Sequence, residues 1–225
     1  MINKAKNIYT YLKNHSKRIK ASLEKSKRKK FEHQHQLTST TWQNRYPAIF
    51  EATQKNATGK KNILSYGCST GEECFSIRQY FPEAIITGAD INEKNLLKAR
   101  KKNNDSNISF INSDSKSLKT KGSFDIIFAM SVLCRWEDTK DIENCKNIYP
   151  FTKFDESINF LINLLNKDGL LVVYNSNFKV EDSTASTLVM PLEIDSILES
   201  GFVHKFDINN FRDISVHNKV IYKKL

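Results

Sequence analysis

From residue 62 onward, short apolar segments alternate with segments in which apolar residues recur at helical spacing. Five apolar segments have the length and the β-branched and aromatic content of buried strands; they cover residues 62–66, 84–90, 107–112, 124–130 and 169–175. Helical spacing marks residues 72–81, 92–103 and 154–168. Strands that alternate with helices predict an α/β protein with a mostly parallel sheet and helices on both faces.

After the fifth strand, the alternation changes. The pattern predicts a helix over residues 191–200 and two strands over 202–208 and 215–225. Because no helix separates these two strands, we expect them to pair with each other as antiparallel strands. The complete sheet is therefore expected to have seven strands, with an antiparallel last strand.

The N-terminal part is predicted to be helical and is strongly basic. Residues 1–35 contain 11 Lys and Arg and 2 Glu, whereas the whole chain contains 35 basic and 25 acidic residues. The remainder is therefore nearly neutral. We divide the chain into a basic N-terminal helical extension, residues 1–58, and a domain, residues 59–225.

Two helices are expected within this extension. The first covers residues 3–30 and carries a narrow apolar stripe, which consists of Ile8, Leu12, Ile19 and Leu23. The second covers residues 38–53, with a cap near Thr38–Thr41 and a kink or restart at Pro47.

The basic helix has several possible partners. It either packs its stripe on its own domain or on a second copy, lies on an anionic membrane surface, or contacts nucleic acid. Few aromatic residues accompany its lysines and the rest of the chain is neutral, which disfavours nucleic acid. The sequence has no apolar run near the ~20 residues of a membrane span and no secretory signal. We therefore expect a cytoplasmic protein, with residues 3–30 allowing peripheral attachment at the inner membrane face.

Cysteine usage points to a reduced protein without a metal centre. The four cysteines are Cys68, Cys74, Cys134 and Cys145. They form no CxxC pair and no cluster with histidine, so no metal site is expected.

The sequence ILSYGCSTGEE at residues 63–73 predicts a ligand-binding loop. A strand ends at Tyr66, glycines follow at 67 and 71, and a helix begins near Glu72. Such a strand–loop–helix unit brings backbone amides close to a ligand. Asp90, nineteen residues beyond Gly71, ends the second strand and is placed to accept hydrogen bonds from both hydroxyls of a ribose.

Asp114 follows the third strand and is placed to receive the exocyclic amine of adenine. The alternative for both aspartates is a structural one, in which Asp90 caps the helix that starts near Asn92 and Asp114 caps a loop. The ordered set of glycine loop and two aspartates favours an adenosine pocket.

The glutamates after the second glycine select among adenosine cofactors. The loop does not follow the GxGxxG pattern of dinucleotide sites, and no Lys-Ser/Thr follows Gly71. Carboxylates at Glu72 and Glu73 repel a pyrophosphate but suit an ammonium group. We therefore predict S-adenosyl-L-methionine, whose amino-acid end carries an ammonium.

Over residues 60–225 the chain resembles the class I S-adenosylmethionine-dependent methyltransferases, which have a Rossmann-like fold. CSTGEECFS (68–76) is similar to the Ser-Thr-Gly-Glu-Glu motif of chemotaxis receptor (CheR-type) methyltransferases. FDIIFAMSV (124–132) resembles the fourth-strand motif beside the cofactor, and LLNKDGLLVVYN (164–175) the segment that leads into the fifth strand. The broader family usually carries Asp where Ser65 stands and Gly where Ser69 stands. Receptor methylation itself does not follow, because the sequence shows neither the N-terminal helical domain nor the inserted β-subdomain of that family.

The resemblance assigns the methionine ammonium to Glu73 or Glu72. The cofactor-binding residues expected in this chain are Tyr66, Gly67, Cys68, Ser69, Gly71, Glu72, Glu73, Asp90, Ile91, Asp114, Ser115, Ala129 and Met130.

The methyl acceptor is expected beyond the fourth and fifth strands, where two long connections cover residues 131–154 and 176–191. The candidate acceptor-binding residues are Ser131, Arg135, Trp136, Asn175 and Asn177. Each also has a structural alternative: an Arg135 pair with Glu137 or Asp138, a Trp136 contact with the core edge, and turn formation by the two asparagines. No residue is identified as a general base, and His204 and His217 are expected to be structural. Arg45 and Tyr46 are placed to fold over the cofactor from the N-terminal side.

The leading hypothesis is O-methylation of a polar acceptor such as a saccharide, a lipid-linked glycan or another small metabolite. The alternatives are a nucleic-acid methyltransferase that uses the basic extension, a protein carboxyl methyltransferase, and an adaptor that keeps the pocket without catalysis. The segment AMSV (129–132) stands where amino-methylating enzymes carry Asn/Asp-Pro-Pro-aromatic, which weighs against the nucleic-acid alternative.

Overall fold

The structure, a computed structural model, describes residues 34–59, 61–194 and 201–225. The chain divides into two compact units, Met1–Gln34 and His35–Leu225. The helix expected over residues 3–30 lies outside the described residues, so the fold presented below is that of the second unit. No helix in the described ranges is long and apolar enough to cross a membrane.

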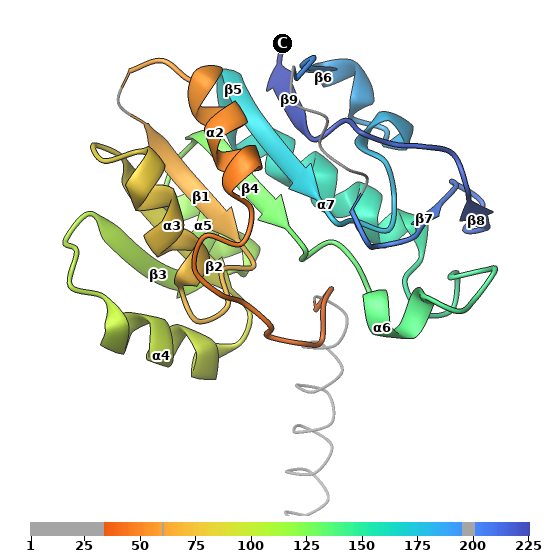
Figure 1. Cartoon of the computed structure of the whole chain (residues 1–225), viewed down its shortest axis with the longest axis horizontal. Coiled ribbons are helices and arrows are strands. Elements are labelled where there is room, and N and C mark those ends of the chain that lie inside the picture. Colours follow the sequence, from red (N-terminus) through yellow and green to blue (C-terminus); the bar gives the residue numbers. More distant parts are fainter. Residues whose placement is uncertain (1–33, 60, 195–200) are drawn as a thin grey trace, which may run out of the picture. The chain divides into compact units, whose positions relative to one another are not determined.

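A seven-stranded sheet in the order β3-β2-β1-β4-β5-β9-β6 forms the centre of this unit (Figure 1). Its strands are β1 (Asn62–Tyr66), β2 (Ile85–Asp90), β3 (Ile108–Asn112), β4 (Phe124–Met130), β5 (Leu165–Tyr174), β6 (Val189–Pro191) and β9 (Ile221–Lys224). Neighbouring strands from β3 to β5 are parallel, and β9 runs antiparallel between β5 and β6. The predicted Rossmann-like, mostly parallel sheet with an antiparallel last strand is confirmed.

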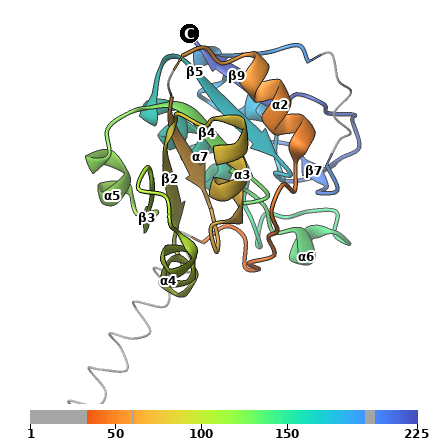
Figure 2. The same ribbon diagram turned by 60° about the vertical axis from the view of Figure 1, so that its left-hand side comes forward.

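Helices cover both faces of the sheet (Figure 2). They are α2 (Pro47–Lys55), α3 (Glu72–Tyr80), α4 (Glu93–Lys102), α5 (Ser115–Thr120), α6 (Trp136–Thr139) and α7 (Phe151–Leu164), with short 3₁₀ turns η1 (Val180–Asp182) and η2 (Ser186–Leu188). Alternate residues of each strand enter opposite cores. Leu64 joins the α7 side, whereas Ile63 joins the side of α2, α3 and α4. Burial on both faces explains why these strands are nearly continuous apolar runs.

Two predicted helices have different bounds in the structure. The helix expected over residues 38–53 begins only at Pro47, so the cap predicted near Thr38–Thr41 is wrong. Proline lacks an N–H and is preset for the first helical position, so it starts this helix. The helix expected to reach residue 168 ends at Leu164, because Leu165 adopts extended dihedrals (φ −78°, ψ 142°) and already belongs to β5.

The C-terminal pairing also differs from the prediction. Only Lys205–Phe206 (β7) of the segment 202–208 is a strand, and it pairs with β8 (Arg212–Asp213) in a separate two-stranded ribbon. A turn closes this ribbon, because the Asp207 amide donates to the carbonyl of Phe211 over 2.8 Å. The expected pairing of 202–208 with 215–225 is therefore wrong.

β6 takes the place in the large sheet that the segment 202–208 was expected to fill. Of the helix expected over residues 191–200, Pro191 lies in β6 and residues 195–200 lie outside the described ranges.

Candidate cofactor and acceptor site

The loop after β1 turns sharply because two glycines adopt left-handed conformations. Gly67 has φ +81° and Gly71 has φ +95°, dihedrals that side chains disfavour. A Cβ added at Gly67 would lie 2.4 Å from Cγ2 of Val132. The amides of Gly67 and Cys68 both donate to the carbonyl of Ala89, over 2.7 and 3.0 Å. The loop is thereby fixed to the end of β2.

The two adjacent glutamates of α3 have different environments. Glu73 is half-buried, and its Oε1 accepts a 2.7 Å hydrogen bond from the Ser65 hydroxyl of β1. Burial raises the pKa of Glu73 to about 7, and the Ser65 hydrogen bond and the charge of Arg45 only partly oppose this. Glu72 accepts hydrogen bonds from Lys102 of α4 and from Thr70. Glu73 is thus the glutamate associated with the strand ends, whereas Glu72 is committed to an ion pair.

Asp90 connects the end of β2 to the glycine loop. Its Oδ2 accepts from the Ser69 amide over 2.8 Å, and its Oδ1 accepts from the Asn92 amide over 2.7 Å. The following residue, Ile91, is half-buried. Asp90 therefore lies at the glycine loop, where the sequence predicts it.

Asp114 is exposed and caps α5. Its carboxylate accepts from the amides of Lys116 and Ser117 and from the Ser117 hydroxyl. The hydrogen bonds from Ser117 hold the pKa of Asp114 below its ordinary value. The structural alternative considered for Asp114 was the cap of a loop; Asp114 instead caps the helix α5, which the sequence pattern did not predict and whose first residue is Ser115.

The last two residues of β4, Ala129 and Met130, are buried beside β5. They pair with Val173 and Tyr174 of that strand. Ala129 and Met130, which the sequence predicts to flank the cofactor, therefore lie at the end of β4, the strand that pairs with β1 and β5.

An N-terminal segment, residues 35–46, which we call the strap, contacts the loop from outside the sheet. The Ser69 hydroxyl donates to the carbonyl of Ser39 over 3.2 Å, and Asn95 of α4 donates to the Ser39 hydroxyl over 2.8 Å. The amide of Asn44 donates to the Ser76 hydroxyl of α3 over 2.7 Å. The strap is therefore attached to the glycine loop and to both helices beside it.

The two ends of the strap are held by long-range side-chain contacts. The ring of His35 is buried, with Nδ1 2.6 Å from the Tyr149 hydroxyl and Nε2 3.2 Å from the Ser157 hydroxyl. At the other end, the Tyr46 hydroxyl lies 2.6 Å from Oγ of Ser131. Sequence reasoning did not identify His35 or Ser39, because no local pattern marks a segment that packs on distant strand ends.

The strand ends of β4 and β5 form a polar cluster with Tyr46. Nδ2 of Asn175 donates to the hydroxyls of Tyr46 and Ser131 over 3.1 and 3.0 Å. Asn175 is 2% exposed, and its Oδ1 has no hydrogen-bond partner within the described residues. Ser131 and Asn175 both have left-handed φ, 54° and 53°, a strained conformation that is typical of functional sites.

The remaining acceptor candidates, Arg135, Trp136 and Asn177, make contacts within the protein. Asn177 is fully buried and structural: its Oδ1 accepts from the Arg135 amide over 2.7 Å, and its Nδ2 donates to Thr139 and to the His204 carbonyl. The Arg135 guanidinium pairs with Asp138 at 3.2 Å. Trp136 packs edge-on against Phe202, with ring centroids 5.4 Å apart.

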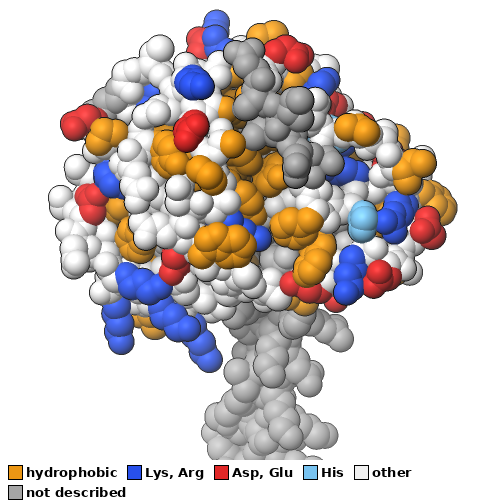
Figure 3. All heavy atoms as spheres, viewed as in Figure 1, with side chains coloured by type: hydrophobic (Ala, Val, Ile, Leu, Met, Phe, Trp, Pro, Cys, Tyr) orange, Lys and Arg blue, Asp and Glu red, His pale blue; other side chains and the backbone are white. Residues whose placement is uncertain are grey.

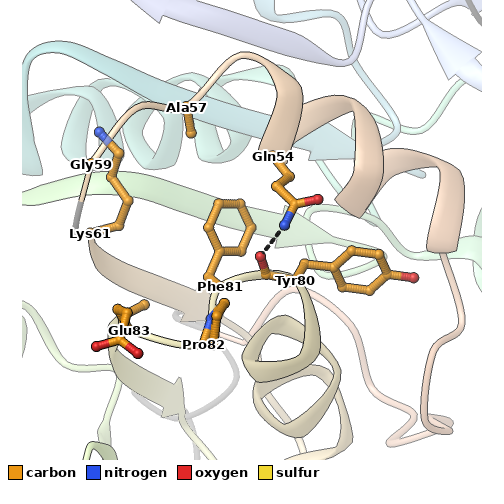
Figure 4. Close-up of a pocket in the computed structure, with 9 residues that line it drawn as sticks. Gln54, Ala57, Gly59, Lys61, Tyr80, Phe81, Pro82 and Glu83 are labelled. Carbon is orange, nitrogen blue, oxygen red and sulfur yellow. Dashed lines mark hydrogen bonds between the residues drawn. The ribbon is translucent and has the colours of Figure 1, made fainter.

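A cavity of about 360 Å³ lies at the amino ends of β1 and β2, whereas the glycine loop lies at their carboxyl ends (Figure 4). It is lined by Gln54, Ala57, Gly59, Lys61, Tyr80, Phe81, Pro82, Glu83 and Ala84. Gln54 donates a hydrogen bond to the Tyr80 carbonyl at its rim. None of the predicted site residues lines this cavity.

The residues at the strand ends fit an adenosyl amino acid. The glycine loop packs closely on Val132, where a Cβ at Gly67 would overlap, and it lies at the end of β2 beside Asp90. Glu73 offers a carboxylate for an ammonium, and Asp90 offers oxygens that retain acceptor capacity for ribose hydroxyls. Within the described part of the chain, no group of three or more potential metal ligands is close enough to hold a metal ion.

The sequence model of a methyltransferase-domain family matches residues 57–210. The chain belongs to this family, the S-adenosylmethionine-dependent methyltransferases, and S-adenosylmethionine is its cofactor. No curated protein sequence matches the chain.

Solved structures with a similar fold include three methyltransferases. An amino pentose methyltransferase of calicheamicin biosynthesis from Micromonospora echinaspora is 16% identical, with a TM-score of 0.44 over 60% of this chain and 50% of that one. The N-methyltransferase NodS from Bradyrhizobium japonicum is 20% identical, with a TM-score of 0.43 over 56% and 58%. The plantazolicin methyltransferase BpumL is 22% identical, with a TM-score of 0.41 over 56% and 44%. The chain thus spans about half the length of these proteins.

Proposed function

We propose that the chain transfers the methyl group of S-adenosylmethionine to an oxygen atom of a polar acceptor, such as a saccharide, a lipid-linked glycan or another small metabolite. The hydrogen-bonded cluster of Tyr46, Ser131 and Asn175 carries this proposal. Its groups are neutral hydroxyls and an amide, which suit a hydroxylated acceptor. No described feature favours a nucleic-acid acceptor or a protein carboxyl group.

In this proposal, three carboxylates and the glycine loop hold the cofactor. Glu73 binds the methionine ammonium, Asp90 binds the ribose hydroxyls, and Asp114 receives the adenine amine with the acceptor capacity that its capping role leaves. The glycine loop lies against the cofactor through its backbone. When bound, S-adenosylmethionine supplies an electrophilic methyl group on a sulfonium.

The residues of the chain then align the acceptor and exclude water. Ser131 and Asn175 orient the acceptor hydroxyl, and the strap covers the reacting atoms from the N-terminal side. Burial raises the pKa of Tyr46 above its ordinary value, so its phenol stays protonated at neutral pH and acts as a hydrogen-bond donor. Alignment in a dry site is the principal contribution expected of the protein.

Calorimetric titration with S-adenosylmethionine and with NAD tests the cofactor assignment. We expect saturable binding of S-adenosylmethionine alone, weakened about 10- to 100-fold by Glu73→Gln. Glu72→Gln is the matched control and should retain affinity, because Glu72 is paired with Lys102. Absence of binding to folded wild-type protein would contradict the proposal.

A panel of hydroxylated, amine and carboxylate acceptors, analysed by mass spectrometry, tests the acceptor class. A mass increase of one methyl group, confined to hydroxylated compounds and lost when the hydroxyl is replaced by hydrogen, supports O-methylation. Methyl transfer only to an amine, a nucleic acid or a protein carboxyl group would refute it.

We further propose that the protein reaches its acceptor at an anionic membrane surface. Residues 1–35 carry 11 basic and 2 acidic side chains. The segment 202–216, which contains the C-terminal ribbon, exposes apolar side chains next to charged ones (Figure 3); they are Phe202, Ile208, Phe211, Ile214 and Val216. Basic and apolar groups together favour binding to anionic lipid.

Co-sedimentation with vesicles tests this attachment. We expect binding to phosphatidylcholine mixed with phosphatidylglycerol, no binding to phosphatidylcholine alone, and weaker binding of Ile214→Asp. Equal recovery with both vesicle types would contradict it.

A further inference from the structure

Arg45 has a defined orientation in the strap. Its guanidinium carbon lies 4.3 Å from the ring centroid of Trp42 and 5.0 Å from that of Tyr46. Its NH1 group donates to the carbonyl of Thr40 over 3.0 Å. Contacts with two aromatic rings hold a planar guanidinium in place and leave other N–H groups for a ligand.

The neighbouring residues of Arg45 bring it close to α3. The amide of Asn44 is hydrogen-bonded to the Ser76 hydroxyl, and Ser76 lies three residues after Glu73, on the same side of the helix. On the other side, the Tyr46 hydroxyl contacts Ser131 at the end of β4. Arg45 therefore stands between the helix that carries Glu73 and the polar cluster at the strand ends.

Arg45 and Glu73 interact electrostatically but do not touch. The charge of Arg45 lowers the pKa of Glu73 against the larger effect of burial. In the described part of the chain, no ion pair includes Arg45, and the hydrogen bond found for Glu73 comes from Ser65. Separated opposite charges in a partly buried site remain poorly satisfied until a ligand bridges them.

We propose that Arg45 binds the α-carboxylate of the cofactor's amino-acid end while Glu73 binds its ammonium. The ammonium and the carboxylate of an amino acid are bonded to the same carbon, so one zwitterion offers opposite charges to a carboxylate and to a guanidinium that influence each other without contact. The inference rests on the proposed cofactor role of Glu73 and adds a residue from outside the sheet. It makes the strap part of the cofactor site, so that cofactor binding fastens the strap.

Two ligands distinguish binding of the amino-acid end by Arg45 from a general effect of Arg45 on the cofactor site. S-adenosylhomocysteine carries the amino-acid end, whereas 5′-methylthioadenosine keeps the adenosine and the thioether but lacks both charges. Calorimetry with each ligand on wild type, Arg45→Gln, Arg45→Lys and the control Arg212→Gln gives the affinity differences. Arg212 is a suitable control because it contacts His204 in the C-terminal ribbon rather than the glycine loop.

We expect Arg45→Gln to weaken S-adenosylhomocysteine binding about 10- to 100-fold and to change 5′-methylthioadenosine binding less than about 2-fold. Arg45→Lys should lie between wild type and Arg45→Gln, since it keeps the charge but loses the planar group. Arg212→Gln should leave both affinities unchanged.

Equal weakening of both ligands by Arg45→Gln, or no weakening of either, would overturn the inference while leaving the cofactor assignment intact. If wild type binds neither ligand, the proposed function fails, and this inference fails with it. Urea denaturation of each variant shows that the domain remains folded under the titration conditions.

Discussion

The Ser65 hydroxyl donates a 2.7 Å hydrogen bond to Oε1 of Glu73 and so joins the end of β1 to the first turn of α3. This carboxyl group is half-buried, and its pKa is raised to about 7, chiefly by burial. The folded protein therefore holds a proton on Glu73 at pH values where the unfolded chain has released it.

Stability should consequently fall as pH rises through this window. The contribution of Glu73 is fully present below its unfolded pKa of about 4.5 and is lost as pH rises through about 7. We expect wild type to lose on the order of 2 kcal/mol between pH 5 and 8 relative to Glu73→Gln. Urea denaturation of both proteins at several pH values measures the difference.

Glu72→Gln provides a control with the opposite sign. Burial raises the pKa of Glu72, but the hydrogen bonds from Lys102 and Thr70 outweigh burial and lower this pKa. The contribution of Glu72 to stability is therefore lost as pH falls rather than as pH rises. A flat pH dependence of wild type relative to Glu73→Gln would refute the burial of this carboxyl group.

Gly67→Ala should destabilise the domain more than Gly122→Ala, although both glycines have φ near +80°. A Cβ at Gly67 overlaps Val132, whereas a Cβ at Gly122 meets nothing within 4 Å. We expect losses of about 1 kcal/mol at Gly122 and at least about 2 kcal/mol at Gly67 in urea denaturation. Adding Val132→Ala should recover part of the Gly67→Ala loss, and failure to do so would disprove the steric cause.

Asp90→Asn should lower both stability and cofactor affinity. The two carboxylate oxygens accept from different backbone amides, those of Ser69 and Asn92, and a side-chain amide has only one oxygen to offer. We expect a loss of about 1–3 kcal/mol and weaker S-adenosylmethionine binding by calorimetry.

Asp105→Asn is the comparison for this variant, because Asp105 also accepts with both oxygens, from Asn107 and Arg78. Its substitution should affect stability but not cofactor affinity. Equal effects of the two variants on binding would rule out a specific role of Asp90.

Tyr46→Phe removes the hydroxyl that joins the strap to Ser131 and Asn175. We expect a stability loss of about 1–2 kcal/mol and a rise in KM for the acceptor. Tyr80→Phe should change stability by less than about 0.5 kcal/mol, since its hydrogen bond to Asn44 is exposed. An unchanged KM in Tyr46→Phe would argue against a part for the strap in acceptor binding.

The sequence by itself determined the elements whose signals are local. Apolar periodicity located β1 to β5 and most of the helices, and the glycines, the adjacent Glu72 and Glu73, and Asp90 marked the loop because the left-handed turn and the carboxylates are encoded within a few residues. The class of the protein followed from the order of these features along the chain.

Only the tertiary structure decided which distant residues meet. Tyr46 contacts Ser131 and Asn175, 85 and 129 positions away, and no periodicity records such a contact. The strap was expected to be helical from residue 38 but is held in a non-helical path by side chains of the loop and of α3 and α4. Likewise, β6 rather than the segment 202–208 pairs with β9. Strands of two or three residues have too few residues for a clear sequence pattern. Which of them pairs with β9 therefore depends on how the segments pack in the folded protein.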